Sequence, residues 1–231
     1  SNGDYFQKNY IPKEDAELIK LLKIEGAIIL GKTNVPLFCI DWQTTNFWNG
    51  QTNNPYDISR VAGGSSGGST VSVSAGFSPL EIGSDAGGSI RVPAHFNGIC
   101  GLRPTENLLS NYGHLQAPNK PLGNRNIVTP GPLAKNVDDL RLLMSVLTPK
   151  STISFNNKVE NYLLELSDLK IAYSDTINDT EIDYEYLEIF RTFIKKIKKQ
   201  TDKIKEEKPI YDEQKAYLEY NKVIGFEMGF N

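Results

Sequence analysis

Apolar residues recur at helical spacing in three stretches of the chain, and this pattern predicts three amphipathic helices. Residues 14–25, EDAELIKLLKIE, carry acidic residues in the first turn and end before Gly26. Residues 136–147 begin at Asn136, a favourable N-cap residue, and residues 184–199 repeat the spacing. The predicted inward residues are Leu18, Ile19, Leu21, Leu22 and Ile24, then Leu140, Leu143, Met144 and Leu147, then Leu187, Phe190, Phe193, Ile194 and Ile197.

Short apolar runs bounded by glycine, proline or polar residues predict strands at four places. They are GAIILG at residues 26–31, the only one of the four predicted to be buried on this pattern, and PLEIGS at 79–84, GICGLR at 98–103 and LKIAYS at 169–174, predicted simply as strands. Alternation of helices and strands along a chain is typical of an α/β protein. The polar segment 33–60 is expected to form loops packed on the body, and residues 150–168 are expected to be an insertion or a boundary.

The composition is that of an ordinary globular protein. The 231 residues are 39% hydrophobic and 23% charged with a net charge of −3, which does not favour binding to nucleic acid or to an anionic membrane. No apolar run approaches the length of a membrane span. Cys39 and Cys100 match no metal or redox spacing, which predicts two reduced thiols in a cytoplasmic protein. The lysine-rich residues 195–205 are interpreted as a solvated face.

Two clusters of glycine and serine are candidates for a functional site. They are GGSSGGST at residues 63–70 and GSDAGGSIR at residues 83–91. The first cluster has the glycine spacing of a P-loop, but Ser69 stands where that motif needs a lysine, which disfavours nucleotide binding. The preceding residues also do not resemble the strand that a P-loop follows.

The first cluster also matches Gly-x-Ser-x-Gly around Ser65, the nucleophile elbow of α/β-hydrolases. The Ser-His-Asp triad of such an enzyme would need one of the two histidines in the chain. His95 is interpreted as a helix-packing residue, and His114 lies in a loop rich in Gly, Asn and Pro. This alternative therefore has weak support.

Both clusters contain the tripeptide Gly-Gly-Ser, which ends at Ser65 in the first and at Ser89 in the second. Paired glycines let the backbone approach a ligand closely. Successive N–H groups before a serine can point at one spot and stabilise an oxyanion. The alternative, that both clusters are tight turns between strands and helices, stays open on the residues alone.

GGSSGGS followed by GSDAGGSIRVPAHFNGICGLRPT resembles the signature of the amidase signature family. The segments GAIILGKTNVPLF, GQTNNPYDISRVAGGSSGGS and GPLAKNVDDLRLL resemble further parts of that family in the same order. The resemblance is strong over residues 14–147 and weaker over residues 169–231. It implies that residues 1–231 are part of a single amidase signature domain, an α/β fold with a mixed, twisted β-sheet flanked by helices.

The resemblance implies hydrolysis of a carboxamide C–N bond by a Ser–Ser–Lys triad, with no metal and no organic cofactor. Ser89 would be the nucleophile. Ser65 would be the bridging serine, after a cis peptide bond from Gly64. A desolvated neutral lysine can take the proton that makes a serine hydroxyl nucleophilic.

The remaining site residues implied by the resemblance support the nucleophile. The oxyanion hole would be formed by the backbone N–H groups of Ala86, Gly87, Gly88 and Ser89. The loops would be fixed by Ser66, Asp85 and Arg91.

The family's catalytic lysine lies in a stretch that precedes the helix at residues 14–25, and that stretch is absent from this sequence. Lys32 is the nearest candidate, but its position is not that of the base in the family. The chain also starts without Met and stops inside a helical pattern. We therefore expect a piece of a longer protein, incomplete at both ends and inactive alone.

The leading hypothesis is a general amidase with a small-molecule amide substrate, no nucleic-acid or membrane partner, and a homo-oligomeric state left open. One alternative is the amidase-type subunit of the tRNA-dependent glutamine amidotransferase. The loop at residues 114–135 resembles general amidases more than that subunit. The other alternative is a non-catalytic remnant that only binds.

Overall fold

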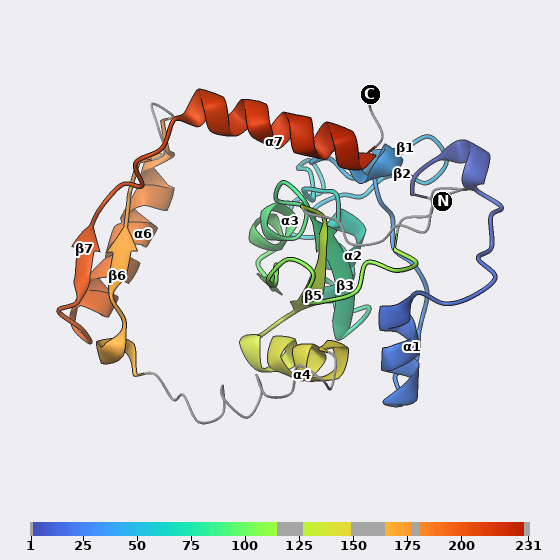
Figure 1. Cartoon of the computed structure of the whole chain (residues 1–231), viewed down its shortest axis with the longest axis horizontal. Coiled ribbons are helices and arrows are strands. Elements are labelled where there is room, and N and C mark those ends of the chain that lie inside the picture. The colour runs from blue at the N-terminus through green and yellow to red at the C-terminus, as the bar shows by residue number, and fades with distance from the viewer. Residues whose placement is uncertain (1, 115–126, 149–164, 177–180, 229–231) are drawn as a thin grey trace. The chain divides into compact units, whose positions relative to one another are not determined.

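The computed structural model describes residues 2–114, 127–148, 165–176 and 181–228 of the chain (Figure 1). The chain divides into two compact units, one formed by Ser1–Ile153 with Tyr220–Asn231 and the other by Ser154–Glu219. Most of the predicted insertion at 150–168 lies outside the described residues, and so do residues 115–126 of the loop at 114–135.

A three-stranded antiparallel sheet, in the order β3-β5-β4, lies at the centre of the larger unit. Strands β3 and β5 pair over their whole length, from Leu80 opposite Ala134 to Asp85 opposite Thr129. The strands of this unit are β1 (Thr45–Asn46), β2 (Gly50–Gln51), β3 (Leu80–Asp85), β4 (Cys100–Gly101) and β5 (Thr129–Ala134). Its helices are η1 (Tyr5–Gln7), α1 (Glu17–Ile24), η2 (Leu37–Cys39), α2 (Gly67–Ser74), α3 (Arg91–Phe96) and α4 (Val137–Leu147).

The two faces of this sheet pack against different helices, because successive side chains of a strand point to opposite faces. Leu80 and Ile82 of β3 pack on a core cluster supplied largely by α1 and α4, made of Leu18, Leu109, Leu143 and Leu147. Leu133 of β5 lies opposite Glu81, so it faces the other way. It packs against Ile90 and Ala94, beside α3. Helices α1 and α4 therefore cover one face of the sheet, and α2 and α3 lie on the other side.

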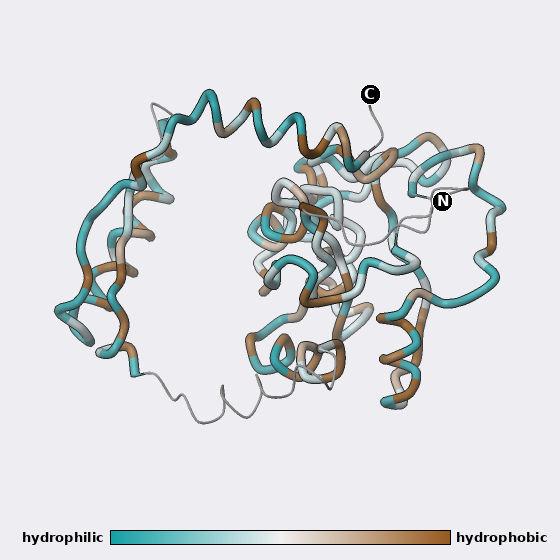
Figure 2. The backbone as a smooth tube through the Cα atoms, viewed as in Figure 1, coloured by the Kyte–Doolittle hydropathy of each residue, from teal (hydrophilic) through white to brown (hydrophobic). Residues whose placement is uncertain are grey.

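The helices predicted from periodicity are confirmed at α1, α4 and, in the smaller unit, α6 (Tyr184–Lys198). Hydrophobic and hydrophilic residues alternate with the helical turn along α1 and α4 (Figure 2). The Asn136 side chain caps α4 by accepting a hydrogen bond from the Asp139 N–H at 2.8 Å. Two predicted inward residues are wrong, since Ile24 is 77% exposed and Phe193 is 55% exposed. Both lie at the margin of the apolar stripe, where burial depends on a neighbour.

Three of the predicted strands are confirmed, at β3, β4 and β6 (Ile171–Tyr173). The prediction of a buried strand at residues 26–31 is wrong, because these residues are neither strand nor buried. Ile28 is 85% exposed and Leu30 is 74% exposed. A strand needs a neighbour to pair its backbone groups, and none of the described strands lies beside this segment.

The smaller unit is a β–α–β arrangement. Strand β6 pairs in parallel with β7 (Ile204–Glu206), and α6 lies between them in the sequence. The unit also holds the short helix η4 (Leu166–Asp168) and the first residues of α7 (Glu213–Met228). The lysines between residues 195 and 205 are exposed, which confirms the interpretation of a solvated face. No helix in the described ranges combines the length and apolar character that crossing a membrane would require.

Close packing around Gly68 in the first turn of α2 generates a stability prediction. A Cβ atom at Gly68 would overlap the backbone O and N of Asn34, whereas a Cβ at Gly31 would have no atom within 4 Å. Alanine is normally better than glycine in a helix by about 1 kcal/mol. We expect the overlap to outweigh this, so that Gly68→Ala lowers the free energy of unfolding by ~1–3 kcal/mol.

The matched control is Gly31→Ala, which should change the free energy of unfolding by less than ~1 kcal/mol. Urea denaturation followed by circular dichroism measures both variants. Equal stability of the two variants would show that α2 does not depend on this close approach.

Candidate active site

The two glycine–serine clusters meet at the start of α2 and α3. Ser66 directly precedes α2, and Ser89 lies two residues before α3. The Ser66 N–H donates to the carbonyl oxygen of Ser89 at 3.1 Å, and the Ser66 hydroxyl accepts from the Ser84 N–H at 3.3 Å. These bonds join both loops to the end of β3, so the structure brings the two predicted serine loops together.

Ser65 and Ser89 line one pocket of about 420 Å³. Both serines are buried, with 2% and 9% of their surface exposed. The peptide bond between Gly64 and Ser65 is cis, as predicted. Ala86 and Gly87 of the expected oxyanion loop also line the pocket. The pocket lining does not include Ser66, Asp85 or Arg91. These residues hold the loops through hydrogen bonds outside the pocket.

Glycine is required at two points of these loops for different reasons. Gly88 has a φ of +113°, in the region that residues with a side chain rarely adopt. Gly64 allows the chain at Asp41 and Trp42 to cross the serine loop, because a Cβ would lie 2.6 Å from the Asp41 carbonyl oxygen. This crossing explains part of the glycine cluster without a phosphate ligand.

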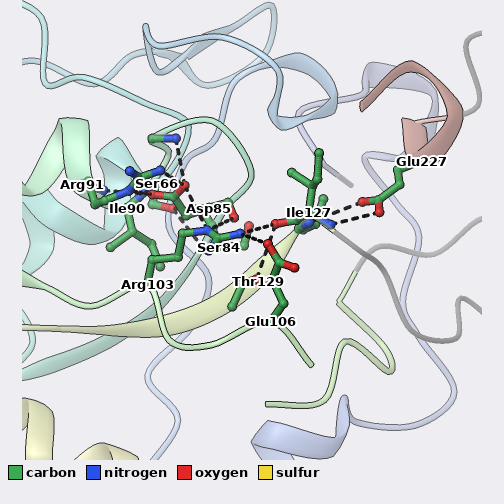
Figure 3. A network of polar contacts seen from close by, with 12 residues as sticks. Ser66, Ser84, Asp85, Ile90, Arg91, Arg103, Glu106, Ile127, Thr129 and Glu227 are labelled. Atoms are coloured by element: carbon green, nitrogen blue, oxygen red, sulfur yellow. Dashed lines mark hydrogen bonds and ion pairs between the residues drawn. The ribbon is translucent and has the colours of Figure 1, made fainter. Parts of the chain in front are cut away.

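The carboxylate of Asp85 is fully buried and organises the loop that carries Ser89 (Figure 3). It accepts hydrogen bonds from the N–H groups of Gly88 at 2.8 Å, Ile90 at 3.1 Å and Arg91 at 3.2 Å. The Arg91 guanidinium adds two more, to Oδ1 at 2.8 Å and to Oδ2 at 3.0 Å. Two of the donor residues, Gly88 and Ile90, flank Ser89 in the sequence, so the carboxylate holds the backbone on both sides of that serine.

The pKa of Asp85 reflects two opposing effects. Burial by itself raises the pKa, but the hydrogen bonds from Arg91, Gly88 and Ile90 lower it more, so that the pKa lies below the ordinary value. Asp85 is therefore a fixed negative charge. An ionised carboxylate has no proton to donate, so Asp85 cannot act as a general acid near neutral pH.

The prediction that the Gly88 N–H belongs to the oxyanion hole needs correction. Because this N–H donates to Asp85, it is not available to an oxyanion. In the described part of the chain, the N–H groups of Ala86, Gly87 and Ser89 donate to no protein acceptor. Of the four amides predicted for the oxyanion hole, these three therefore remain open to a ligand.

The pocket has two walls that the sequence analysis missed. One wall comes from the loop around η2 and the other from α7. Their lining side chains are Phe38, Cys39, Ile40 and Trp42 in the loop and Tyr220, Asn221 and Ile224 in α7. The period-two alternation of apolar residues from Phe38 to Trp42 was an available signal in the sequence, whereas the helical pattern near the end of the chain gave no sign that α7 lines a pocket.

Two titratable groups in these walls stay protonated at neutral pH. Burial raises the pKa of the Cys39 thiol to about 11, and the positive charge of Lys32 opposes this only in part. The Tyr220 hydroxyl lies directly against Gly87. Burial and then the negative charge of Asp85 raise the pKa of Tyr220, so it remains a neutral hydroxyl.

No lysine or histidine is found among the described residues that line the pocket. Lys32 is exposed. His95 is also exposed, contrary to the packing interpretation, because Pro93 and Ala94 take the buried side of α3. The pocket therefore gives no support to a Ser-His-Asp triad. The described ranges also hold no group of three or more His, Cys, Asp or Glu side chains that could hold a metal ion.

Comparison with known proteins identifies the family. The family model described as Amidase matches residues 1–229, so this chain belongs to the amidase family. The A subunit of the glutamyl-tRNA(Gln) amidotransferase from Sulfurisphaera tokodaii is 39% identical over 204 residues, which cover 86% of this chain and 42% of that protein. The corresponding protein of Archaeoglobus fulgidus is 42% identical over 163 residues, which cover 71% of this chain and 34% of that protein.

Solved structures confirm the predicted amidase signature fold. The A subunit of the glutamyl-tRNA(Gln) amidotransferase from Thermotoga maritima has a TM-score of 0.83 at 28% identity, covering 100% of this chain and 51% of that one. Fatty acid amide hydrolase has a TM-score of 0.73 at 26% identity, covering 94% of this chain and 39% of that one. The chain thus spans less than half the length of the curated relatives and about half the length of the Thermotoga maritima protein.

The buried Asp85 charge predicts a loss of stability when it is removed. Asp85→Asn should lower the free energy of unfolding at pH 7 by ~2–4 kcal/mol, because charge-assisted hydrogen bonds to the loop are lost. Since the folded pKa lies below the ordinary value of 3.8, the stabilisation is complete above about pH 4 and disappears as the pH falls through the folded pKa.

The measurement is urea unfolding of both proteins between pH 7 and pH 3. The control is Asp138→Asn, since Asp138 is 88% exposed and should contribute little. If the difference in free energy of unfolding between the wild type and Asp85→Asn grew as the pH fell, Asp85 would not be the stabilising ionised carboxylate.

Proposed function

We propose that this chain carries the nucleophile of an amidase that cleaves a carboxamide C–N bond through an acyl-enzyme. The observation that carries the proposal is the shared pocket, in which buried Ser65 and Ser89 lie beside the backbone of Ala86 and Gly87. Membership of the amidase family supports it. We also propose that both units belong to one amidase domain, since the family match runs through both.

In the proposed reaction, Ser89 Oγ attacks the carbonyl carbon of the amide and its proton passes through Ser65 to a base. A new C–O bond forms, and the carbonyl electrons move onto oxygen. That oxygen accepts hydrogen bonds from the amides of Ala86 and Gly87. The proton then reaches the leaving nitrogen as the C–N bond breaks, and water hydrolyses the ester. We propose that the base is a lysine outside the described pocket lining.

The pocket walls support a neutral amide with an apolar group as substrate. None of the described lining residues carries a charged side chain, and Phe38, Ile40, Trp42, Val128 and Ile224 present apolar surface. Glutamine would bring an α-carboxylate and an α-ammonium group, each of which needs a compensating partner when it leaves water. This observation favours the general amidase.

The amidase-type subunit of a glutamine amidotransferase is the second candidate. Eight curated relatives at 36–44% identity all carry the name of the A subunit of glutamyl-tRNA(Gln) amidotransferase. A glutaminase assay of the whole protein, with and without partner subunits, separates the two candidates. Glutamate release that requires partners would favour the second candidate, whereas hydrolysis of simple amides without partners favours the first. A cytoplasmic location and a homo-oligomeric state stay predictions.

The first functional prediction concerns the nucleophile. In an active form of the protein, Ser89→Ala should lower kcat by at least ~10⁴-fold, because the acyl group has no other acceptor. Ser72→Ala is the control: Ser72 lies in the last turn of α2, outside the pocket lining, and its hydroxyl bonds to that of Ser78, so kcat should stay unchanged. Unaltered unfolding curves show that both variants fold. Near-normal turnover by Ser89→Ala would exclude it as the nucleophile.

The second functional prediction concerns the base. The 231-residue chain alone should show no measurable amidase activity, because loss of general-base assistance costs about 10²–10⁴-fold and triad members act as a unit. A form extended upstream to include a lysine-bearing segment should be active, and Lys32→Met in that form should leave kcat/KM within about twofold. Equal hydrolysis of simple amides by the short and extended forms would show that Lys32 or a histidine is the base.

A further inference from the structure

We propose that Glu227 is a positioning residue that ties the α7 wall of the pocket to the chain entering β5 and, through it, to the nucleophile loop. The inference rests on the proposed function, because it concerns how the amide is held for attack by Ser89. It assigns a role to a carboxylate on α7 that takes no part in the chemistry.

The Glu227 carboxylate binds two consecutive backbone amides (Figure 3). Its Oε1 accepts from the Ile127 N–H at 3.0 Å, and its Oε2 accepts from the Val128 N–H at 3.3 Å. These residues directly precede β5, and Val128 itself lines the pocket. The Glu227 side chain therefore joins two parts of the pocket lining. One is Val128, next to β5, and the other is α7, which supplies Tyr220 and Ile224.

A continuous chain of polar contacts leads from this clasp to Asp85, beside the Ser89 loop (Figure 3). The Ile127 carbonyl oxygen accepts from Arg103 Nη2 at 2.9 Å. Arg103 Nε donates to the Asp85 carbonyl oxygen at 3.4 Å and lies 3.8 Å from Asp85 Oδ1. Asp85 in turn holds the amides on either side of Ser89. Arg103 is 23% exposed, so its side chain is held between these partners and has little contact with solvent.

The geometry makes Glu227 matter for catalysis beyond its effect on stability. The amide substrate would lie between the α7 wall and the Ser89 loop, and both are attached to residues 127–128. A displacement of about 1 Å between a bound group and its nucleophile can cost about 100-fold in rate. The carboxylate is suited to hold this spacing, because each of its oxygens accepts from one of two adjacent donors.

Glu227→Gln in an active form of the protein is the main test. Glutamine keeps the shape but offers one acceptor oxygen, and its NH₂ group would face the other backbone N–H. We expect kcat/KM to fall by about 10- to 100-fold, with a higher KM from the displaced wall and a lower kcat from the loosened loop. Glu213→Gln on the same helix is the control, because Glu213 is exposed, and it should change neither constant more than about twofold.

Rates are expressed per active site, titrated by labelling of Ser89 with a sulfonyl fluoride, so that unfolded protein does not count. Glu227→Asp is the second variant. It keeps the charge but draws α7 closer by one methylene, and we expect an intermediate loss. If both variants retain the wild-type kcat and KM per active site, Glu227 is merely structural and the proposal is overturned.

Hydrogen exchange of the Ile127 and Val128 amides gives a readout that does not depend on activity. Exchange should be faster in Glu227→Gln than in the wild type or in Glu213→Gln. Faster exchange in Glu227→Gln would support the clasp. If Ser89→Ala nevertheless retained activity, the proposed function would be refuted, and with it the catalytic role of Glu227. Unchanged exchange in Glu227→Gln would refute the clasp while the proposed function stands.

Discussion

The buried charge of Asp85 is the constraint on which the site depends. A carboxylate removed from water costs several kcal/mol unless donors replace the lost hydration. Here the replacement consists of backbone amides and the Arg91 guanidinium, so the protein can bury the charge only by wrapping residues 88–91 around it. This wrapping turns Ser89 toward the pocket. The position of Ser89, the proposed nucleophile, therefore follows from the need to solvate the neighbouring Asp85 charge.

The serine loops also depend on each other. The Ser66 N–H bonds to the Ser89 carbonyl oxygen, and glycines at residues 64 and 68 let residues 34 and 41–42 cross within contact distance of the first loop. Small residues in the first cluster therefore allow close packing of the chain and also place Ser65 in the pocket. The alternative that both clusters are merely tight turns between strands and helices describes their local geometry correctly. It does not account for the pocket that both clusters line.

Local patterns predicted the parts of the structure that local forces determine. The Asn136 cap and the apolar stripe of α4 need no information from elsewhere in the chain. The run at residues 26–31 failed because a strand also needs a partner, which its own composition does not specify. Resemblance to a family identified the two serines, but not the use of the Gly88 amide by Asp85. The bonds from Ile127 and Val128 to Glu227 cross about a hundred residues, and no periodicity encodes them.

The walls of the pocket belong to different parts of the chain from its reactive loops. Phe38, Ile40 and Trp42 lie on an exposed loop, and Ile224 lies on a helix distant in sequence from the glycine clusters. None of these wall side chains is among the donors that bind the Asp85 carboxylate. In the proposed amidase, substitutions in these walls can therefore alter which amide is bound while the donors around Asp85 stay in place, so that one scaffold can serve enzymes of differing selectivity.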